Sequence, residues 1–114
     1  MRYISANTAP RNRLPNRRLA ESFSFEVGGL SYVCTIGRFG DGRLGEVFLS
    51  NHKSNSGADT AARDAAIACS IALQYGAPLE VIRQALCRDS RGRASGPLGA
   101  ALDLISEMDG GEQC

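Results

Sequence analysis

Hydrophobic and polar residues alternate in the first half of the chain, and a period of two is typical of β-strands that bury one face. Residues 22–27 and 30–36 alternate in this way, and residues 44–50 form a third apolar run. The runs are separated by Gly28-Gly29 and Asp41-Gly42, and both pairs favour tight turns. The pattern therefore predicts a three-stranded antiparallel β-meander, which needs an apolar layer on one face.

The spacing of apolar residues changes to three and four in the second half, as on one face of an α-helix. The longest such stretch is residues 58–75, and its expected buried face consists of Ala58, Ala61, Ala62, Ala65, Cys69, Ala72 and Leu73. Gly76 suits the end of this helix, while Pro78 and Pro97 suit the starts of two more. In the last helix we expect these residues to face inward: Leu98, Ala101, Leu102 and Ile105. Strands followed by helices predict the α+β class, with the long Ala-rich helix packed on the sheet.

Length, net charge and the distribution of Arg residues indicate how the chain is organised into segments. Its 114 residues fit one domain, and its net charge of +1 gives no strong field for nucleic acid or a membrane. We expect residues 1–20, which are rich in Arg, to form a flexible basic arm, residues 21–108 the folded domain, and residues 109–114 a polar tail. The arm is either a solvated leader or a segment that binds phosphate, nucleic acid or an acidic partner.

The sequence also bears on location and on metal binding. No apolar run approaches a membrane span and the N-terminus lacks the apolar core of a signal peptide, so we expect a cytoplasmic protein without membrane contact. The four cysteines are Cys34, Cys69, Cys87 and Cys114. They form no CxxC pair, so neither a zinc site nor an iron–sulfur cluster is expected. We predict reduced thiols, with Cys114 the best candidate for adventitious disulfide formation.

The segment between the third strand and the long helix is the first candidate site. Free N–H groups and the helix dipole favour an anion there. Its polar side chains add donors, so we predict a phosphate or nucleotide site formed by His52, Lys53, Ser54, Asn55, Ser56 and Gly57. The alternative is an ordinary helix cap provided by Ser56 or Asp59. His52 is either a general base or phosphate ligand, or simply an exposed loop residue.

A second basic loop precedes the last helix and contains Arg88, Arg91 and Arg93. It is either a solvated loop or, together with the Arg residues of the arm, a phosphate-binding surface. No Ser/His/Asp arrangement and no catalytic carboxylate pair is evident, and the chain contains no Trp for a base-stacking platform. The sequence therefore favours binding over catalysis.

Two stretches carry a resemblance to a known family. Residues 41–50 read D-G-R-L-G-E-V-F-L-S, followed by Lys53-Ser54 and Ser56-Gly57, and residues 66–78 read A-I-A-C-S-I-A-L-Q-Y-G-A-P. Both resemble the TSCPD domain, and the similarity extends over residues 23–105. Such domains lie at the C-terminal end of adenosylcobalamin-dependent ribonucleotide reductases, and short free-standing versions exist.

The chain departs from that family in its cysteines. Residues 94–98 read A-S-G-P-L where the family reads T-S-C-P-D, so the Cys and the Asp are both missing. Family members inside full reductases are followed by a cysteine-rich tail, of which only Cys114 remains here. A dithiol that passes electrons is therefore not expected within one chain.

The resemblance implies a part in ribonucleotide reduction or in deoxyribonucleotide supply for DNA synthesis. A catalytic barrel does not fit in 114 residues, so we expect no activity from the chain alone and no cofactor in it, although the related reductases use adenosylcobalamin. The first hypothesis is an accessory module that binds a nucleotide or a reductase catalytic subunit. The alternatives are a small nucleic-acid-associated protein, and a detached part of a reductase that is active only with its catalytic subunit. Open sheet edges would also permit a homodimer.

Overall fold

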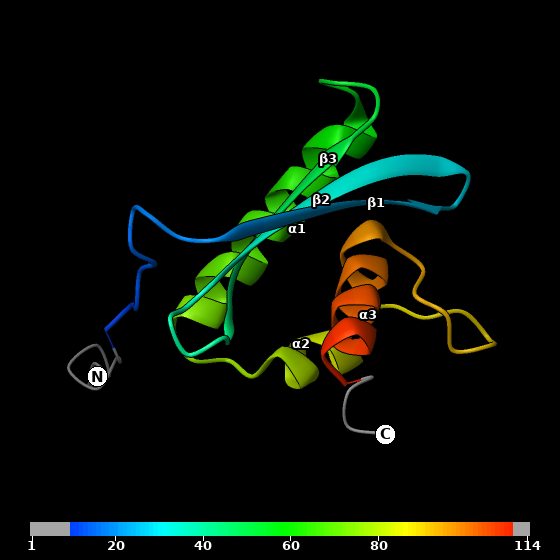
Figure 1. Cartoon of the computed structure of the whole chain (residues 1–114). Coiled ribbons are helices and arrows are strands. Elements are labelled where there is room, and N and C mark those ends of the chain that lie inside the picture. Colours follow the sequence, from blue (N-terminus) through cyan, green and yellow to red (C-terminus); the bar gives the residue numbers. More distant parts are fainter. Residues whose placement is uncertain (1–9, 111–114) are drawn as a thin grey trace, which may run out of the picture.

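The computed structural model describes residues 10–110 as a three-stranded sheet and three helices (Figure 1). The strands pair antiparallel in the order β1-β2-β3, with bounds Ala20–Val27 for β1, Leu30–Arg38 for β2 and Leu44–Asn51 for β3. The helices follow as α1 Gly57–Gln74, α2 Leu79–Ala85 and α3 Pro97–Gly110. This order confirms the predicted α+β fold, including the meander and both turns.

The sheet has one buried and one open face. Residues that point inward are Tyr32, Cys34, Ile36, Val47 and Leu49, and all of them are buried. On the outward face Thr35 pairs with Phe48, whose side chain is 50% exposed, and Val33 is 42% exposed. The alternation of apolar and polar residues along the strands therefore predicts correctly which residues form the core. Two large apolar side chains nevertheless remain on the open face.

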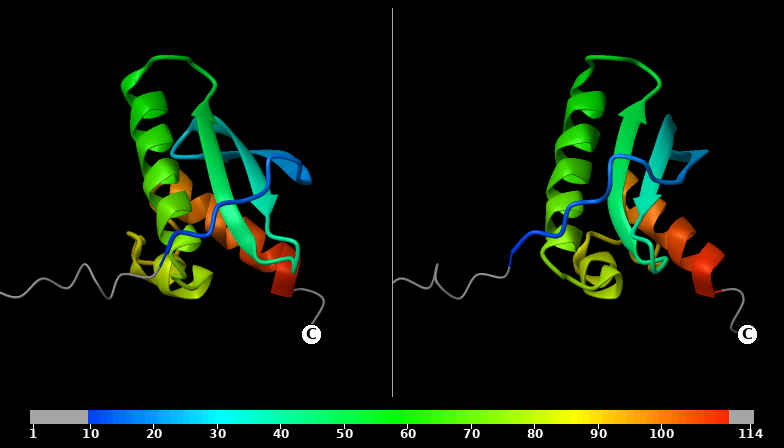
Figure 2. Two further views of the ribbon diagram at one scale, coloured as in Figure 1. Left: turned by 90° about the vertical axis from the view of Figure 1, so that its left-hand side faces the viewer. Right: turned by 60° about the vertical axis from the view of Figure 1, so that its left-hand side comes forward.

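Helices α1 and α3 cover the inward face, with α1 running along β3 and α3 crossing beneath β1 (Figures 1 and 2). The inward residues of α3 are buried as predicted: Leu98, Ala101, Leu102 and Ile105. Fully burying a Leu or Ile side chain contributes roughly 1.5–3 kcal/mol, so Leu98, Leu102 and Ile105 contribute strongly to the core. The shorter α2 contacts α3.

The predicted buried face of α1 is wrong in part. Ala61 is exposed, while the polar residues Asp59, Ser70 and Gln74 are buried. The reason is that α1 lies beside the outer edge of β3, where backbone groups need hydrogen-bond partners. Its inward stripe therefore includes polar side chains that bind this edge.

Three side chains of α1 supply those partners. The Ser70 hydroxyl accepts from the Val47 N–H (2.8 Å) and donates to the Val47 carbonyl (2.9 Å). The Gln74 amide donates to the Gly45 carbonyl at 2.9 Å, and the Asp59 carboxylate accepts from the Asn51 N–H at 2.8 Å. The outer edge of β3 is thus closed to another strand at these positions.

Both ends of α1 follow the sequence signals. Ser56 is the N-cap, and its hydroxyl accepts from the Asp59 N–H at 3.1 Å. Beyond the C-terminus Gly76 has a φ of +102°, and its N–H bonds to the Leu73 carbonyl while the Ala77 N–H bonds to the Ala72 carbonyl. This is a Schellman motif, which requires a left-handed residue at the glycine position.

The part of the N-terminal arm that the structure describes lies against the domain and crosses β3 on its way to β1, in contact with the first residues of that strand (Figure 2). The Arg11 guanidinium donates to the Gln74 side chain at 2.6 Å, and the Asn12 N–H donates to the Gln74 carbonyl at 2.8 Å. Arg18 forms a bidentate ion pair with Glu46 on the outward face of β3. Two Arg residues of the arm are therefore engaged within the domain, and Arg2 lies outside the described residues.

At the other terminus, α3 continues through Gly110, so Asp109 is helical and pairs with Arg38 at 3.0 Å. The rest of the predicted polar tail, including Cys114, lies outside the described residues. Within residues 10–110, no helix is both long and apolar enough to cross a membrane.

Candidate functional site

The loop from β3 to α1 is organised by the carboxylate of Asp59. One oxygen accepts from the Asn51 N–H, and the other accepts from the Asn55 N–H at 3.1 Å and from the Arg63 guanidinium at 3.0 Å. The two backbone hydrogen bonds, helped by the charge of Arg63, hold the pKa of Asp59 below its usual range. Asn55 adopts a left-handed φ of +62°, which turns the chain into the helix. A permanent negative charge therefore already sits at the N-terminus of α1.

Several backbone N–H groups of the predicted phosphate loop already donate hydrogen bonds within the domain. The His52 N–H binds the Ser31 carbonyl (2.9 Å), the Lys53 N–H binds the Asn51 side chain (2.9 Å), and that of Asn55 binds Asp59. Ser56 serves as the helix cap, as the alternative interpretation proposed.

Other donors of this loop remain available. The side chains of His52, Lys53 and Ser54 are exposed and have no hydrogen-bond partner within residues 10–110. In that same range the N–H groups of Gly57 and Ala58, in the first turn of α1, have no acceptor. The loop therefore presents a small set of donors next to one carboxylate.

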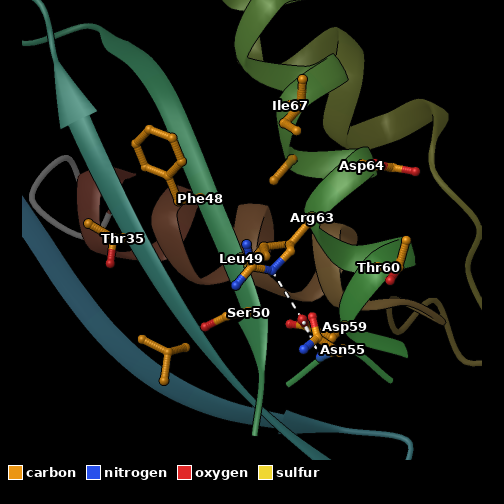
Figure 3. A pocket seen from close by; sticks show the side chains of 12 residues that line it. Thr35, Phe48, Leu49, Ser50, Asn55, Asp59, Thr60, Arg63, Asp64 and Ile67 are labelled. Carbon is orange, nitrogen blue, oxygen red and sulfur yellow. Dashed lines mark hydrogen bonds and ion pairs between the residues drawn. The ribbon is translucent and has the colours of Figure 1, made fainter. Parts of the chain in front are cut away.

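A cleft of about 480 Å³ adjoins this loop, between the outward face of the sheet and the N-terminal half of α1 (Figure 3). Its apolar wall includes Val33, Phe48 and Ile67, and Ile67 is 54% exposed. The end nearest the loop is polar and contains Asn55, Asp59, Thr60, Arg63 and Asp64. An apolar wall with a few polar groups at one end is typical of small-molecule sites.

Arg63 occupies the centre of the cleft in Figure 3, between Phe48 and Asp59. Its ion pair with Asp59 uses one guanidinium nitrogen, and its side chain remains 60% exposed. The other N–H groups of the guanidinium are therefore available to a ligand. Because Asp59 and Asp64 also line the cleft, the site offers both donors and acceptors rather than a simple positive field.

Sequence reasoning found only Asn55 among the cleft residues and missed Phe48, Thr60 and Arg63. Their assembly depends on how α1 lies against β3, which periodicity does not specify. One signal was available in the sequence. Phe48 alternates with the inward residues Val47 and Leu49, so its side chain is expected on the outward face, and neighbouring large apolar side chains on an exposed face often mark a binding site.

The second predicted surface does not join the first. The loop of residues 88–94 lies beside β1 and α3, well apart from residues 52–57 in every view (Figures 1 and 2). Arg88 binds Asp103 through two hydrogen bonds of 2.8 and 2.7 Å, and Arg93 pairs with Asp89 at 3.2 Å. Arg91 alone of the three has an exposed side chain without a carboxylate partner in the described part of the chain.

The described residues contain no cluster of His, Cys, Asp and Glu that could hold a metal ion. Cys34 and Cys69 are buried in the core, and burial raises their pKa values to about 12 and about 11. Thiols in that state are poor nucleophiles, whereas Cys87 is exposed.

Comparison with known proteins gives matches to vitamin B12-dependent ribonucleotide reductases. The vitamin B12-dependent ribonucleotide reductase of Agrobacterium fabrum is 44% identical over 70 residues, which is 61% of this chain and 6% of that protein. The enzyme of the same name from Bradyrhizobium diazoefficiens is 39% identical over 70 residues, with the same coverage of 61% and 6%. That of Rhodopirellula baltica is 39% identical over 72 residues, covering 63% of this chain and 7% of the relative.

No family model matches the chain, so the narrower assignment to the TSCPD domain stays a prediction. No solved structure matches it either. The chain spans about 6% of the length of the first two relatives, so the match concerns a short segment of a much larger enzyme. Because 39–44% of the residues are identical over 70–72 positions, the chain is related to a segment of the vitamin B12-dependent ribonucleotide reductases.

Proposed function

We propose that this chain is an accessory nucleotide-binding domain that acts in deoxyribonucleotide supply for DNA synthesis, in the cytoplasm. The observation that carries the proposal is the cleft beside Phe48, which ends at the donor-rich loop before α1. The relationship to ribonucleotide reductases supports the choice of a nucleotide over other small molecules. The proposal assigns no cofactor to this chain.

The two ends of the cleft suit the two ends of a nucleotide. A base would lie against the exposed ring of Phe48, where stacking contributes about 1–3 kcal/mol. Sugar hydroxyls would meet the hydroxyl of Thr60 and the carboxylate of Asp64. A volume of about 480 Å³ falls within the range of roughly 300–1,000 Å³ that is usual for small-molecule sites.

The phosphate would lie toward the loop. Lys53 supplies a positive charge, and the N–H groups of Gly57 and Ala58 point along the axis of α1 toward it. Asp59 opposes an anion here, but its charge is balanced by two backbone N–H groups and by Arg63. We therefore expect modest affinity for phosphate and a larger contribution from the base.

Nuclear magnetic resonance of the full chain tests this function. Titration with ADP and CDP should shift the amide signals of residues 48–64, and Phe48→Ala should weaken binding by about 5- to 100-fold through loss of stacking. Lys53→Gln should weaken binding of the nucleotides but not of adenosine or cytidine.

The matched control for these variants is Val81→Ala, which removes an exposed apolar side chain from α2, away from the cleft. It should leave affinity unchanged. Absence of any shift at millimolar nucleotide, or equal binding by Phe48→Ala and Val81→Ala, contradicts the proposal.

A second candidate function is docking to a reductase catalytic chain, and it rests on a different observation. The relatives carry the matching segment inside chains more than ten times longer than the match. Ile67 and Ile71 of α1 and its C-cap residue Tyr75 recur at intervals of four and are 54%, 38% and 45% exposed. Co-sedimentation with a B12-dependent reductase that is lost in Ile71→Asp, with nucleotide binding retained, would favour this function over the first.

A further inference from the structure

The two outer edges of the sheet differ in whether their backbone groups have hydrogen-bond partners. The edge of β3 is closed by Asp59, Ser70 and Gln74 of α1. Within residues 10–110, β1 pairs only with β2, and its other edge makes no hydrogen bonds. Open edges are usually protected by Pro or by charged residues, Lys above all; the eight residues of β1 include no Pro, Lys or Arg, and their only charged residues are Glu21 and Glu26.

In an antiparallel sheet the backbone N–H and carbonyl groups of successive residues point alternately to the two neighbouring sides. This alternation determines which backbone groups of β1 lie on its free edge. Val47 directs both its N–H and its carbonyl to Ser70, so its partner Ile36 must bond on the other side, to Glu21 of β1. Every second residue of a strand points its backbone groups to the same side, so the odd-numbered residues of β1 form their backbone hydrogen bonds with β2. Free N–H and carbonyl groups therefore belong to the even-numbered residues: Ala20, Ser22, Ser24 and Glu26.

A groove of about 620 Å³ lies under the same edge, between β1, α3 and the loop of residues 88–94. Its apolar lining includes Phe25, Val27, Ala100 and Leu104. The inward side chains of β1 remain only half-buried, although the Phe25 ring stacks on that of Tyr32 at 5.7 Å. The helical layer thus extends beyond the last strand, and one more strand would cover it.

We propose that a second copy of this chain supplies that strand, so that two β1 strands pair antiparallel about Ser24 and form a continuous six-stranded sheet. Ser24 then faces Ser24 of the other copy, and Ser22 faces Glu26, so that the free groups of these three residues meet free groups, while Ala20 lies beyond the paired segment. Phe23 faces Phe25, which extends the apolar face over the groove.

Other symmetric registers fit less well. Pairing centred between Phe23 and Ser24 places the free backbone groups of one strand opposite residues whose backbone groups already bond to β2. It also brings Glu21 opposite Glu26, where like charges repel. Pairing centred on Phe23 would place the carboxylate of Glu21 against the ring of Phe25 at the groove. Centring on Ser24 avoids the mismatched backbone groups and the facing glutamates. It also moves Glu21 away from the Phe25 ring to the end of the paired segment, opposite Val27.

The oligomeric state of the full chain tests this inference. Sedimentation equilibrium should give twice the 12.1 kDa mass of the monomer at micromolar to millimolar concentration. Ser24→Pro removes an N–H that points away from β2, so it should leave the fold intact and give monomers. Far-ultraviolet circular dichroism verifies the fold of that variant, and Ser24→Lys, which sets two like charges opposite each other, provides a second one.

Disulfide trapping tests the register in a Cys87→Ser, Cys114→Ser background. Hydrogen-bonded antiparallel pairs have Cα atoms about 5.5 Å apart, which a disulfide can span. Ser24→Cys should therefore cross-link under mild oxidation, whereas Ser22→Cys, which faces Glu26 of the other copy, should not. A chain that stays monomeric, a dimer that persists in folded Ser24→Pro, or equal cross-linking of the two cysteine variants overturns the inference. Nucleotide binding by Ser24→Pro should be unchanged, so this result is separate from that of the proposed function.

Discussion

The side chain of Asp59 joins the end of β3, the loop and the first turns of α1. It is 2% exposed and accepts hydrogen bonds from Asn51, Asn55 and Arg63. The sequence placed it as a potential helix cap, but the cap is Ser56 and Asp59 instead holds the loop closed. Its position explains why the loop keeps a fixed shape and why only part of its N–H groups can serve a ligand.

Thiol reactivity gives a prediction at the same scale. In a Cys114→Ser variant, which limits the experiment to described cysteines, Cys87 should react with iodoacetamide more than about 100-fold faster than Cys34 or Cys69. The reason is that burial restricts access to the two core thiols and raises their pKa values to about 12 and about 11. Mass spectrometry of peptides after timed alkylation at pH 8 measures the rates.

Unfolding provides the control for this measurement. In concentrated guanidinium chloride all three cysteines should react at similar rates, because their environments become alike. Modification of Cys34 at the rate of Cys87 in the folded protein would show that the core around β2 opens readily, contrary to its burial.

Individual residues differ in how far the sequence predicts them. Gly76 was identified correctly as the end of α1, and Ser56 was one of the two residues offered as a cap in the alternative interpretation, because capping depends on local backbone geometry. Ser70 and Gln74 were not identified, since a polar residue on a helix is ordinarily assigned to the solvent side. Their burial follows from a tertiary contact with the edge of β3, and spacing along the helix carries no information about that edge.

At the scale of elements, α1 takes the place that a fourth strand would have beside β3. Its side chains satisfy the N–H and carbonyl of Val47, the carbonyl of Gly45 and the N–H of Asn51. The helix therefore covers part of the inward face and one edge of the sheet together. This double role requires polar residues at buried positions of α1.

Ser70→Ala tests the role of that contact. The change leaves the buried N–H and carbonyl of Val47 without their partner, at a cost of about 1–3 kcal/mol. Alanine recovers roughly 0.5 kcal/mol through its higher helix propensity. We therefore expect the free energy of unfolding, measured with urea, to fall by about 1–2 kcal/mol.

Two further variants complete the experiment. Ser90→Ala, in an exposed loop, should change stability by less than about 0.5 kcal/mol. Ser70→Thr keeps the hydroxyl and should recover part of the loss. Equal stabilities of Ser70→Ala and Ser90→Ala would mean that the edge of β3 does not depend on this hydroxyl.

The order and type of elements were predictable, whereas the cleft was not. Strand alternation, the turn pairs Gly28-Gly29 and Asp41-Gly42, and the prolines at the starts of α2 and α3 are local signals, and all were correct. The cleft combines the outward face of β2 and β3 with one side of α1. It is therefore a product of helix placement, and only the exposed ring of Phe48 hinted at it.

For the whole molecule, an ion-pair network connects α2, the following loop and α3. Asp103 of α3 accepts from Arg88 at 2.7 Å and from Arg83 of α2 at 2.9 Å. The hydrogen bonds from Arg88 are the main reason why the pKa of Asp103 is lowered to about 2. Arg83 also binds Glu80, so one cluster holds together the C-terminal half of the chain.

This network predicts a pH dependence of stability. Because the pKa of Asp103 is lower in the folded state than its ordinary value near 4, its contribution is complete above about pH 5 and is lost as the pH falls toward 2. Allowing for solvent screening of a partly exposed pair, we expect Asp103→Asn to lower stability by about 1–2 kcal/mol at pH 7.

Urea unfolding of both proteins between pH 3 and pH 7 measures the effect. The difference between them isolates Asp103 from other carboxylates with lowered pKa values, such as Glu80 and Asp89. It should shrink as the pH falls through 4. A difference that is constant across this range would assign the effect of the variant to lost packing and not to charge.

The hydrogen bond between Arg11 and Gln74 has a consequence for biosynthesis, since it joins residues 63 positions apart. The hydrogen bonds that join the described N-terminal segment to the rest of the domain are made with β3 and with the end of α1, so it acquires these partners after both have been made. At translation rates of about 5–20 residues per second, Arg11 leaves the ribosome roughly 3–13 s before Gln74 does. The part of the domain that emerges first therefore docks only after α1 has been made, and during that interval chaperones have access to it.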